Sequence, residues 1–215
     1  MSNSLQHKIQ AIDQEVLQLH YKWKHLKQIF GSDEKVKLLN NAAPVFFSYL
    51  WNSMLFDVVL SFSRLLDPSM SCGDENLSFK NLLSDISDNA LKDELSKHIS
   101  ELESKTQAMR IWRNEKISHN DLLRALNNNP VPPIQVNEIT EALAIVREIM
   151  KVLRQKSGFP TMLYEVSLLS DPGDGKSLMY YLKYGFDAFK EDTGTVERLE
   201  IYRRRDDEII KLLKD

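Results

Sequence analysis

The sequence predicts an all-α protein, a bundle of five to seven helices, from the spacing of its apolar residues and the placement of its helix breakers. Apolar side chains recur at steps of three and four through most of the 215 residues, as on one face of an α-helix. The 7 glycines and 7 prolines are too few for a collagen-like, linker-like or proline-rich chain. A chain of this length buries roughly 70% of the surface that its unfolded form exposes, which is ample for one globular domain.

The first predicted helix covers residues 5–30. Gly31 ends it, and Ser32 or Asp33 is placed to cap the free amides of a second helix. Pro44 lacks a backbone donor, so we expect the second helix to kink or restart there. The apolar stripe of the first helix consists of Leu5, Ile9, Ile12, Val16, Leu19, Trp23, Leu26 and Phe30.

Residues 45–66 continue the second helix and are apolar on most sides, which predicts a central position in the bundle. A membrane span needs ~20 nearly uncharged residues, whereas this stretch carries Asn52 and Asp57 and begins beside Pro44. No signal peptide opens the chain, because residues 1–10 are polar and no apolar run follows an early basic patch. We therefore expect a soluble protein with no membrane contact.

The middle of the chain alternates between loops and helices, with a capping residue before two of the helices. It is predicted as a loop over 67–74, a helix over 79–86 begun by Ser78, a long helix over 91–112, a loop over 127–133, and a helix that is capped by Asn137 and ends near Gly158.

The C-terminal third has a weaker pattern. Residues 162–169 fit an extended segment or a helix, and 171–175 (DPGDG) form a turn. Helices are expected over 176–190 and 196–214. We therefore predict a helical bundle over 1–160 and a helical extension over 161–215 that packs on the same domain.

Composition excludes several classes of protein. A formal net charge of -3 and a pI near 6.0 argue against a basic protein that coats nucleic acid, although a local basic cleft stays open. The single cysteine, Cys72, excludes an internal disulfide framework and any cysteine-based zinc site. We expect a cytoplasmic protein that needs no metal and no cofactor.

One histidine differs from the other four in its neighbours. His7, His20, His25 and His98 are best interpreted as surface or structural residues. His119 instead ends the segment 110–119 (RIWRNEKISH), which places an arginine, an amide and an imidazole near the end of a long helix.

Arg113-Asn114 followed by His119 resembles the motif of the HEPN superfamily (higher eukaryotes and prokaryotes nucleotide-binding), an arginine and a polar residue that precede a histidine. The chain is similar, more narrowly, to the AbiU-type branch linked to abortive phage resistance. Three local features carry that resemblance: the run Arg64-Leu65-Leu66-Asp67-Pro68, the run Glu75-Asn76-Leu77-Ser78, and Trp112-Arg113 leading to Ile117-Ser118-His119-Asn120-Asp121.

The resemblance implies a helical bundle that dimerises so that two copies of the motif face a shared cleft. Many members are metal-independent ribonucleases that act as toxins, defence effectors or RNA-processing factors, and some relatives are not catalytic. Some HEPN toxins carry a tyrosine two residues after the histidine, where a partner enzyme modifies it. This chain has Asp121 there, so regulation by that route is not predicted. An antitoxin or another defence-system partner remains open.

The three motif residues fit RNA cleavage by attack of the 2′-hydroxyl. His119 titrates near neutral pH and suits a general acid or base. Arg113 offers a planar, permanent charge to the phosphate, and Asn114 can position it. On an ideal helix Arg113 and His119 lie ~120° apart and ~9 Å apart along the axis. One helix therefore does not gather both easily, and we predict a homodimer whose cleft both copies line.

Neighbouring side chains have two interpretations each. Lys116, Arg110 and Arg124 extend a surface for the RNA backbone, or form an ordinary solvated face. Glu115 orients the His119 ring, or makes an exposed helix pair. Trp112 packs against that ring, or fills the core.

The leading functional hypothesis is a metal-independent HEPN-type RNA endonuclease in phage defence or toxicity. The alternative is a HEPN-like module that binds nucleotide, RNA or a protein without catalysis, and a third hypothesis is a purely structural scaffold. The sequence does not specify the RNA substrate or the trigger.

Overall fold

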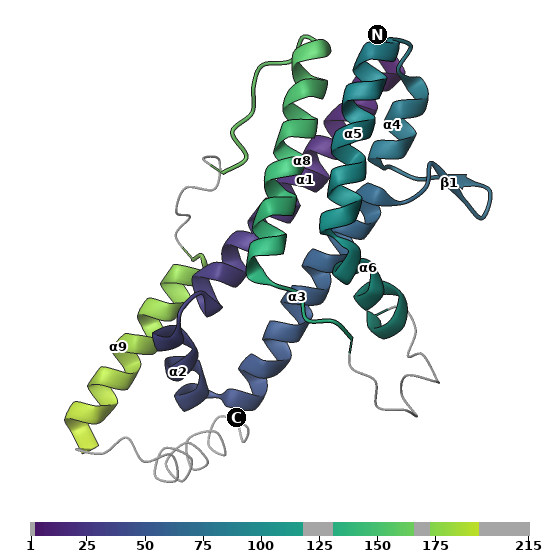
Figure 1. Cartoon of the computed structure of the whole chain (residues 1–215). Coiled ribbons are helices and arrows are strands. Elements are labelled where there is room, and N and C mark those ends of the chain that lie inside the picture. The colour runs from purple at the N-terminus through teal and green to yellow at the C-terminus, as the bar shows by residue number, and fades with distance from the viewer. Residues whose placement is uncertain (1–2, 118–130, 166–172, 194–215) are drawn as a thin grey trace, which may run out of the picture. The chain divides into compact units, whose positions relative to one another are not determined.

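The all-α prediction is confirmed by the computed structural model, which describes residues 3–117, 131–165 and 173–193 (Figure 1). These ranges contain eight α-helices, one π-helical turn and a two-stranded hairpin. Five to seven helices were expected. The additional ones arise because Ala43 divides the second predicted helix and Thr106 divides the long one. The predicted helix over 196–214 lies outside the described residues.

The chain forms two compact units. The first unit comprises residues 1–24 and 52–169, and the second comprises 25–51 and 170–215. The predicted division into 1–160 and 161–215 stays a prediction, since much of the C-terminal part lies outside the described residues.

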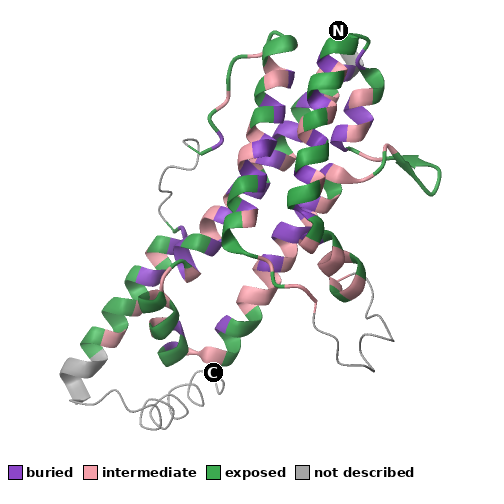
Figure 2. Ribbon diagram, in the orientation of Figure 1, coloured by how far each residue is buried: buried purple, intermediate pink, exposed green. Residues whose placement is uncertain are grey.

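The first unit buries its core between long helices. Its elements are α1 (Asn3–Phe30) as far as Lys24, α3 (Pro44–Leu66) from Asn52, α4 (Phe79–Asp85), α5 (Asn89–Lys105), α6 (Gln107–Trp112), the π-helical turn η1 (Arg113–Ile117) and α8 (Val136–Lys156). In this unit the predicted stripe of α1 is buried from Leu5 to Trp23, with Ile9, Ile12 and Val16 fully enclosed. The last predicted member, Phe30, is only partly buried, and its neighbour Ile29 is buried instead. Buried residues face inward along α1, α5 and α8 (Figure 2). Helical periodicity therefore located this core correctly.

Helix starts follow the predicted capping residues in two cases and differ in one. The Ser32 side chain accepts from the Lys35 amide, and the Ser78 side chain accepts from the Asn81 amide. Asn137 was expected to cap α8, but the helix already begins at Val136. Gln135 caps the helix instead, two residues before the predicted cap, and its amide donates to the Glu138 carboxylate at 3.0 Å.

Helix α3 is only partly the central helix that the sequence predicts. Its C-terminal half, within the first unit, buries Val58, Val59 and Phe62. Its first turns leave Val45 84% and Tyr49 71% exposed, so that part of the prediction was wrong. In the described part of the chain, α3 is the one helix long and apolar enough to cross a membrane. The core helix of a water-soluble protein meets the same criteria of length and composition.

A small hairpin replaces part of the loop expected over 67–74. Strand β1 (Met70–Ser71) pairs antiparallel with β2 (Asp74–Glu75). Both residues between them have positive φ, 53° for Cys72 and 95° for Gly73, as a type I′ turn requires. The hairpin thus brings Glu75 back opposite Met70, in the loop that follows α3.

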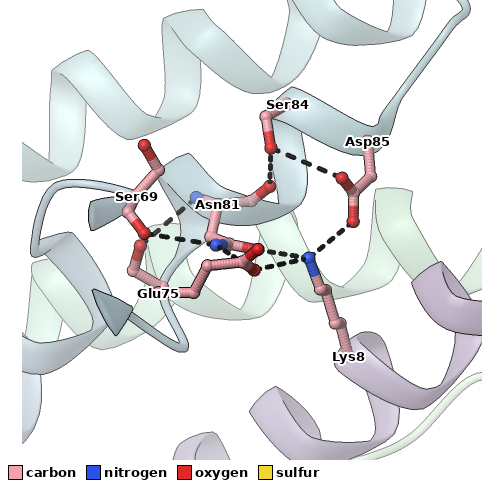
Figure 3. A network of polar contacts seen from close by, with 7 residues as sticks. Lys8, Ser69, Glu75, Asn81, Ser84 and Asp85 are labelled. Atoms are coloured by element: carbon pink, nitrogen blue, oxygen red, sulfur yellow. Dashed lines mark hydrogen bonds and ion pairs between the residues drawn. The ribbon is translucent and has the colours of Figure 1, made fainter. Parts of the chain in front are cut away.

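A polar network ties this hairpin to α1 and α4 (Figure 3). The Lys8 ammonium donates to the Asn81 side-chain oxygen at 2.8 Å and pairs with Asp85 at 2.8 Å and Glu75 at 3.2 Å. The Asn81 side-chain amide donates to the Ser69 carbonyl and to Glu75, each at 3.2 Å. These bonds, first the one from Asn81 and then that from Lys8, hold the pKa of Glu75 below its usual value. The loop after α3 is therefore held in place from two helices.

The second unit is organised around the start of α9 (Gly175–Thr193), which follows the predicted turn at 171–175. Asp174 caps α9 by accepting from the Lys176 and Ser177 amides. Its other carboxylate oxygen accepts from the Gln28 side chain at 2.7 Å. The Gly175 amide donates to Gln28 and to the His25 ring nitrogen. His25 is thus a structural residue, as the sequence indicated, and α2 (Asp33–Ala42) completes this unit.

A second polar network is buried in the first unit between α1 and α8. The Asp13 carboxylate accepts from both the Arg154 guanidinium and the Tyr164 hydroxyl. His20 stacks on Tyr164 with ring centroids 5.5 Å apart, and its Nδ1 contacts the Val16 carbonyl at 2.9 Å. Burial lowers the pKa of His20 below 6.5, although the bond to Val16 works in the opposite direction.

This histidine makes stability fall on acidification. Between the lowered folded pKa of His20 and its unfolded value of 6.5, the unfolded chain binds more protons than the folded chain. We expect the free energy of unfolding to be highest above pH 6.5 and to decrease below it, by at most ~1.4 kcal/mol per pH unit from this residue. Urea unfolding between about pH 7.5 and pH 5.5 measures the slope. His20→Gln should flatten it and His98→Gln should not; equal slopes for both variants would contradict the assignment.

Candidate nucleic-acid interface

Two of the three predicted catalytic residues open a π-helical turn. Arg113 and Asn114 are the first residues of η1, which follows α6 directly. Such turns are rare and are frequently found at functional sites. The Arg113 guanidinium donates to the Asn114 side-chain oxygen at 3.3 Å. His119 and Arg124 lie outside the described residues, so their places in the site stay predictions.

The π-helical turn changes the geometry assumed from the sequence. The projection of ~120° between Arg113 and His119 requires α-helical winding throughout. Residues 113–117 wind as a π-helix, so that projection does not apply. The same holds for the expected alignment of Glu115 with His119. The predicted need for a second copy of the motif therefore loses this geometric support and rests on the resemblance alone.

Arg113 is held by an acid from another element. Its guanidinium pairs with the Asp67 carboxylate, with 3.5 Å between nitrogen and oxygen. The two side chains are 40% and 25% exposed, so water and solutes reach the pair. Asp67 follows the last residue of α3, and the Asn76 amide side chain fixes the next residue by donating to the Pro68 carbonyl at 2.8 Å. The structure thus joins the three sequence features that carried the resemblance.

A cavity of about 200 Å³ lies beside this pair, between the end of α3, α4 and the α5–α6 junction. Its floor includes the buried side chains of Phe62 and Met109. The cavity is lined by Phe62, Ser63, Leu66, Asp67, Pro68, Lys80, Glu103, Thr106, Met109, Arg110 and Arg113. Two of the three predicted arginines, Arg110 and Arg113, therefore line one cavity.

The charges around the cavity are unevenly paired. Lys80 pairs with Glu103 at 2.5 Å, and Arg113 pairs with Asp67. In the described part of the chain, no carboxylate pairs with the Arg110 guanidinium. Three cations and two acids leave this wall with an excess of one positive charge. An anion is therefore the type of ligand that the cavity favours.

Lys116 and Trp112, which flank Arg113 and Asn114 in the sequence, make a cation–π contact. The Lys116 ammonium lies 4.3 Å from the centre of the Trp112 ring, which also packs edge-on against Phe56. The Trp112 indole N–H donates to the Pro132 carbonyl at 2.6 Å, which holds the start of the segment before α8. Trp112 is thus a packing residue, and Lys116 sits over its ring while remaining exposed.

Sequence reasoning missed the charged side chains that pair at this site. Asp67 was quoted only as part of a motif, and neither Lys80 nor Glu103 was singled out. The run RLLDP was the one available signal for Asp67, but it does not say which residue the carboxylate contacts. The described residues contain no group of three or more His, Cys, Asp or Glu side chains with metal-binding geometry. This arrangement can offer an anionic ligand the guanidinium groups of Arg113 and Arg110 and the side-chain amide of Asn114.

Comparison with known proteins agrees with the motif. The sequence profile of the AbiU2 family, a family of HEPN proteins, matches residues 2–156. Comparison with curated proteins and with solved structures finds no match. The profile covers α1 to α8, including the cavity and the Arg113-Asn114…His119 motif. The chain therefore belongs to the AbiU2 family of the HEPN superfamily.

Proposed function

We propose that this HEPN module is a metal-independent RNA endonuclease with a role in phage defence or as a toxin. The observation that carries the proposal is the position of Arg113. The motif arginine lies at a solvent-accessible cavity with a surplus positive charge, next to the motif amide of Asn114. A cytoplasmic location and a defence-system or antitoxin partner belong to the same proposal.

Each motif residue has a separate role in the reaction. The 2′-hydroxyl oxygen attacks the adjacent phosphorus and the bond to the 5′-oxygen breaks. His119 acts as general acid or base in these proton transfers. Arg113 stabilises the charge that develops on the phosphate oxygens, and Asn114 positions the guanidinium through its side-chain oxygen. The products are a 2′,3′-cyclic phosphate and a 5′-hydroxyl, and a homodimer would line the cleft with both copies of the motif.

Removing metal ions provides the test. We expect the purified protein to cleave bulk RNA in excess chelator at the same rate as without it, because proton transfer and charge stabilisation come from side chains alone. End-group analysis of the fragments should find cyclic phosphates. The control is Arg113→Ala, which keeps His119 but loses the guanidinium. Complete loss of cleavage in chelator, or equal cleavage by Arg113→Ala, would remove this proposal.

A second candidate is a HEPN-like module that binds without catalysis. It is favoured by the pairing of the motif cation within the chain, since the Arg113 guanidinium already contacts Asp67. This candidate predicts affinity for RNA or nucleotide without turnover, so binding measured beside the chelator assay separates the two.

A further inference from the structure

We propose that the cavity between α3, α4 and the α5–α6 junction binds one phosphate group of the RNA backbone. Arg110 is the main residue that binds it, and the Asp67 carboxylate competes with the phosphate for Arg113. This inference rests on the proposed function, because it takes RNA as the ligand. It adds Arg110 as a second donor to a backbone phosphate, beside the motif residue Arg113. Arg110 and Arg113 supply the donors, and the carboxylate of Asp67 occupies Arg113 when no RNA is bound.

The cavity is large enough for a phosphate group but too small for a whole nucleotide. At about 200 Å³ it is smaller than the roughly 300–1,000 Å³ of pockets that enclose drug-sized molecules. A phosphate with its water fits that space, and a base with its sugar would stay outside. The apolar floor of Phe62 and Met109 excludes water on one side, which strengthens the attraction between a phosphate and a guanidinium.

Of the three cations that line the cavity, Arg110 is the one best placed to bind a phosphate. Lys80 is engaged by Glu103 at 2.5 Å, whereas Arg110 is exposed and has no carboxylate partner among the described residues. Arg113 is engaged only weakly, because its 3.5 Å contact with Asp67 is long for a charge-assisted hydrogen bond. A phosphate entering beside Arg110 therefore finds a second guanidinium, Arg113, whose long ion pair with Asp67 it can replace while the hydrogen bond to Asn114 remains.

The experiment measures binding of a fluorescent 2′-O-methyl RNA oligonucleotide, which lacks the attacking hydroxyl and is not cleaved by this chemistry. We expect Arg110→Gln to weaken binding about tenfold, as for loss of a charged hydrogen bond. The salt dependence of its log affinity should also become shallower by about 0.7, as for one fewer phosphate contact on a single strand. The matched control is Arg64→Gln, an exposed arginine near the end of α3 that does not line the cavity.

Asp67→Asn tests the competitor. Removing this carboxylate should tighten binding about two- to fivefold, because the exposed pair with Arg113 no longer has to be exchanged. Equal weakening by Arg110→Gln and Arg64→Gln, or weaker binding by Asp67→Asn, would overturn the proposal. Binding is measured with an oligonucleotide that is not cleaved. A protein that binds it as expected but never cleaves RNA would therefore contradict the proposed nuclease activity and not the phosphate site.

Occupancy of the cavity itself is read from Met109, which forms part of its floor. With methyl-labelled methionine, the oligonucleotide should shift the Met109 signal in the wild type and in Arg64→Gln but not in Arg110→Gln; Met109→Leu assigns the signal. A shift caused by inorganic phosphate or ATP and not by the oligonucleotide would assign the cavity to a free phosphate compound and overturn the RNA assignment.

Discussion

Replacing His119 by alanine should lower the rate of RNA cleavage by about 10²–10⁴-fold, the usual contribution of a general acid or base. Alanine offers no group that titrates near neutral pH, while the arginines at the cavity remain to bind the phosphate. Binding of the 2′-O-methyl oligonucleotide should therefore change far less than cleavage. Single-turnover cleavage of a defined RNA by wild type and variant gives the ratio of rates.

The matched control for this variant is His98→Ala on α5. Both changes remove one imidazole, but residue 98 does not line the cavity beside the motif. The same pair of variants expressed in cells compares toxicity, which His119→Ala should abolish and His98→Ala should retain. Cleavage by His119→Ala at the rate of His98→Ala would show that the imidazole takes no part in the reaction.

Replacing Asp13 by alanine should cost about 3–5 kcal/mol of unfolding free energy, the range measured when one partner of a buried ion pair is removed. The side chains of Asp13 and Arg154 are only 6% and 12% exposed. Alanine leaves the Arg154 charge buried without its partner and removes the acceptor of the Tyr164 hydroxyl. Typical domains are stable by about 5–15 kcal/mol, so the loss is a large fraction of the total.

Urea unfolding of the full chain measures this cost, and two further variants define its origin. Glu15→Ala removes an acid two positions along α1 whose contact with Arg64 is exposed and 4.0 Å long, and it should cost less than about 1 kcal/mol. Tyr164→Phe keeps the ion pair and should cost about 1 kcal/mol. Burial and the Asp13 carboxylate both raise the pKa of Tyr164, so its hydroxyl stays a donor. A cost for Asp13→Ala as small as that for Glu15→Ala would contradict the buried network.

Most of the fold could be predicted because its signals are local. The apolar stripe of α1 repeats through seven turns, and Ser32 and Ser78 cap helices in the way that their side chains favour. The break at Thr106 left no such signal, since buried apolar residues continue on both sides of it at helical spacing, as Leu102 and Met109 show. Its hydroxyl donates to the Leu102 carbonyl, a bond that forms inside helices as well as at their ends.

The candidate site could be predicted only in part because it depends on long-range contacts. Arg113 and Asn114 follow from their spacing to His119. The contact between Arg113 and Asp67 does not, since it joins α3 to η1 and requires the hairpin at 70–75 to hold the intervening loop. The π-helical winding of 113–117 has no recognisable sequence pattern either. The absence of an ion-pair partner for Arg110 within the described residues became visible only once the neighbouring acids were placed.

The tight turn between β1 and β2 provides a single site at which a fluorescent dye can be attached. Cys72 is exposed at its tip and carries the only thiol in the chain. A maleimide dye attached there would label one position, with no need to mutate other cysteines first. Because the Asn76 side chain links the base of the hairpin to the Pro68 carbonyl, the dye would be attached to the loop that carries Asp67, whose contact with Arg113 is the one that RNA is proposed to replace. Its emission or rotational freedom would then follow that replacement in real time.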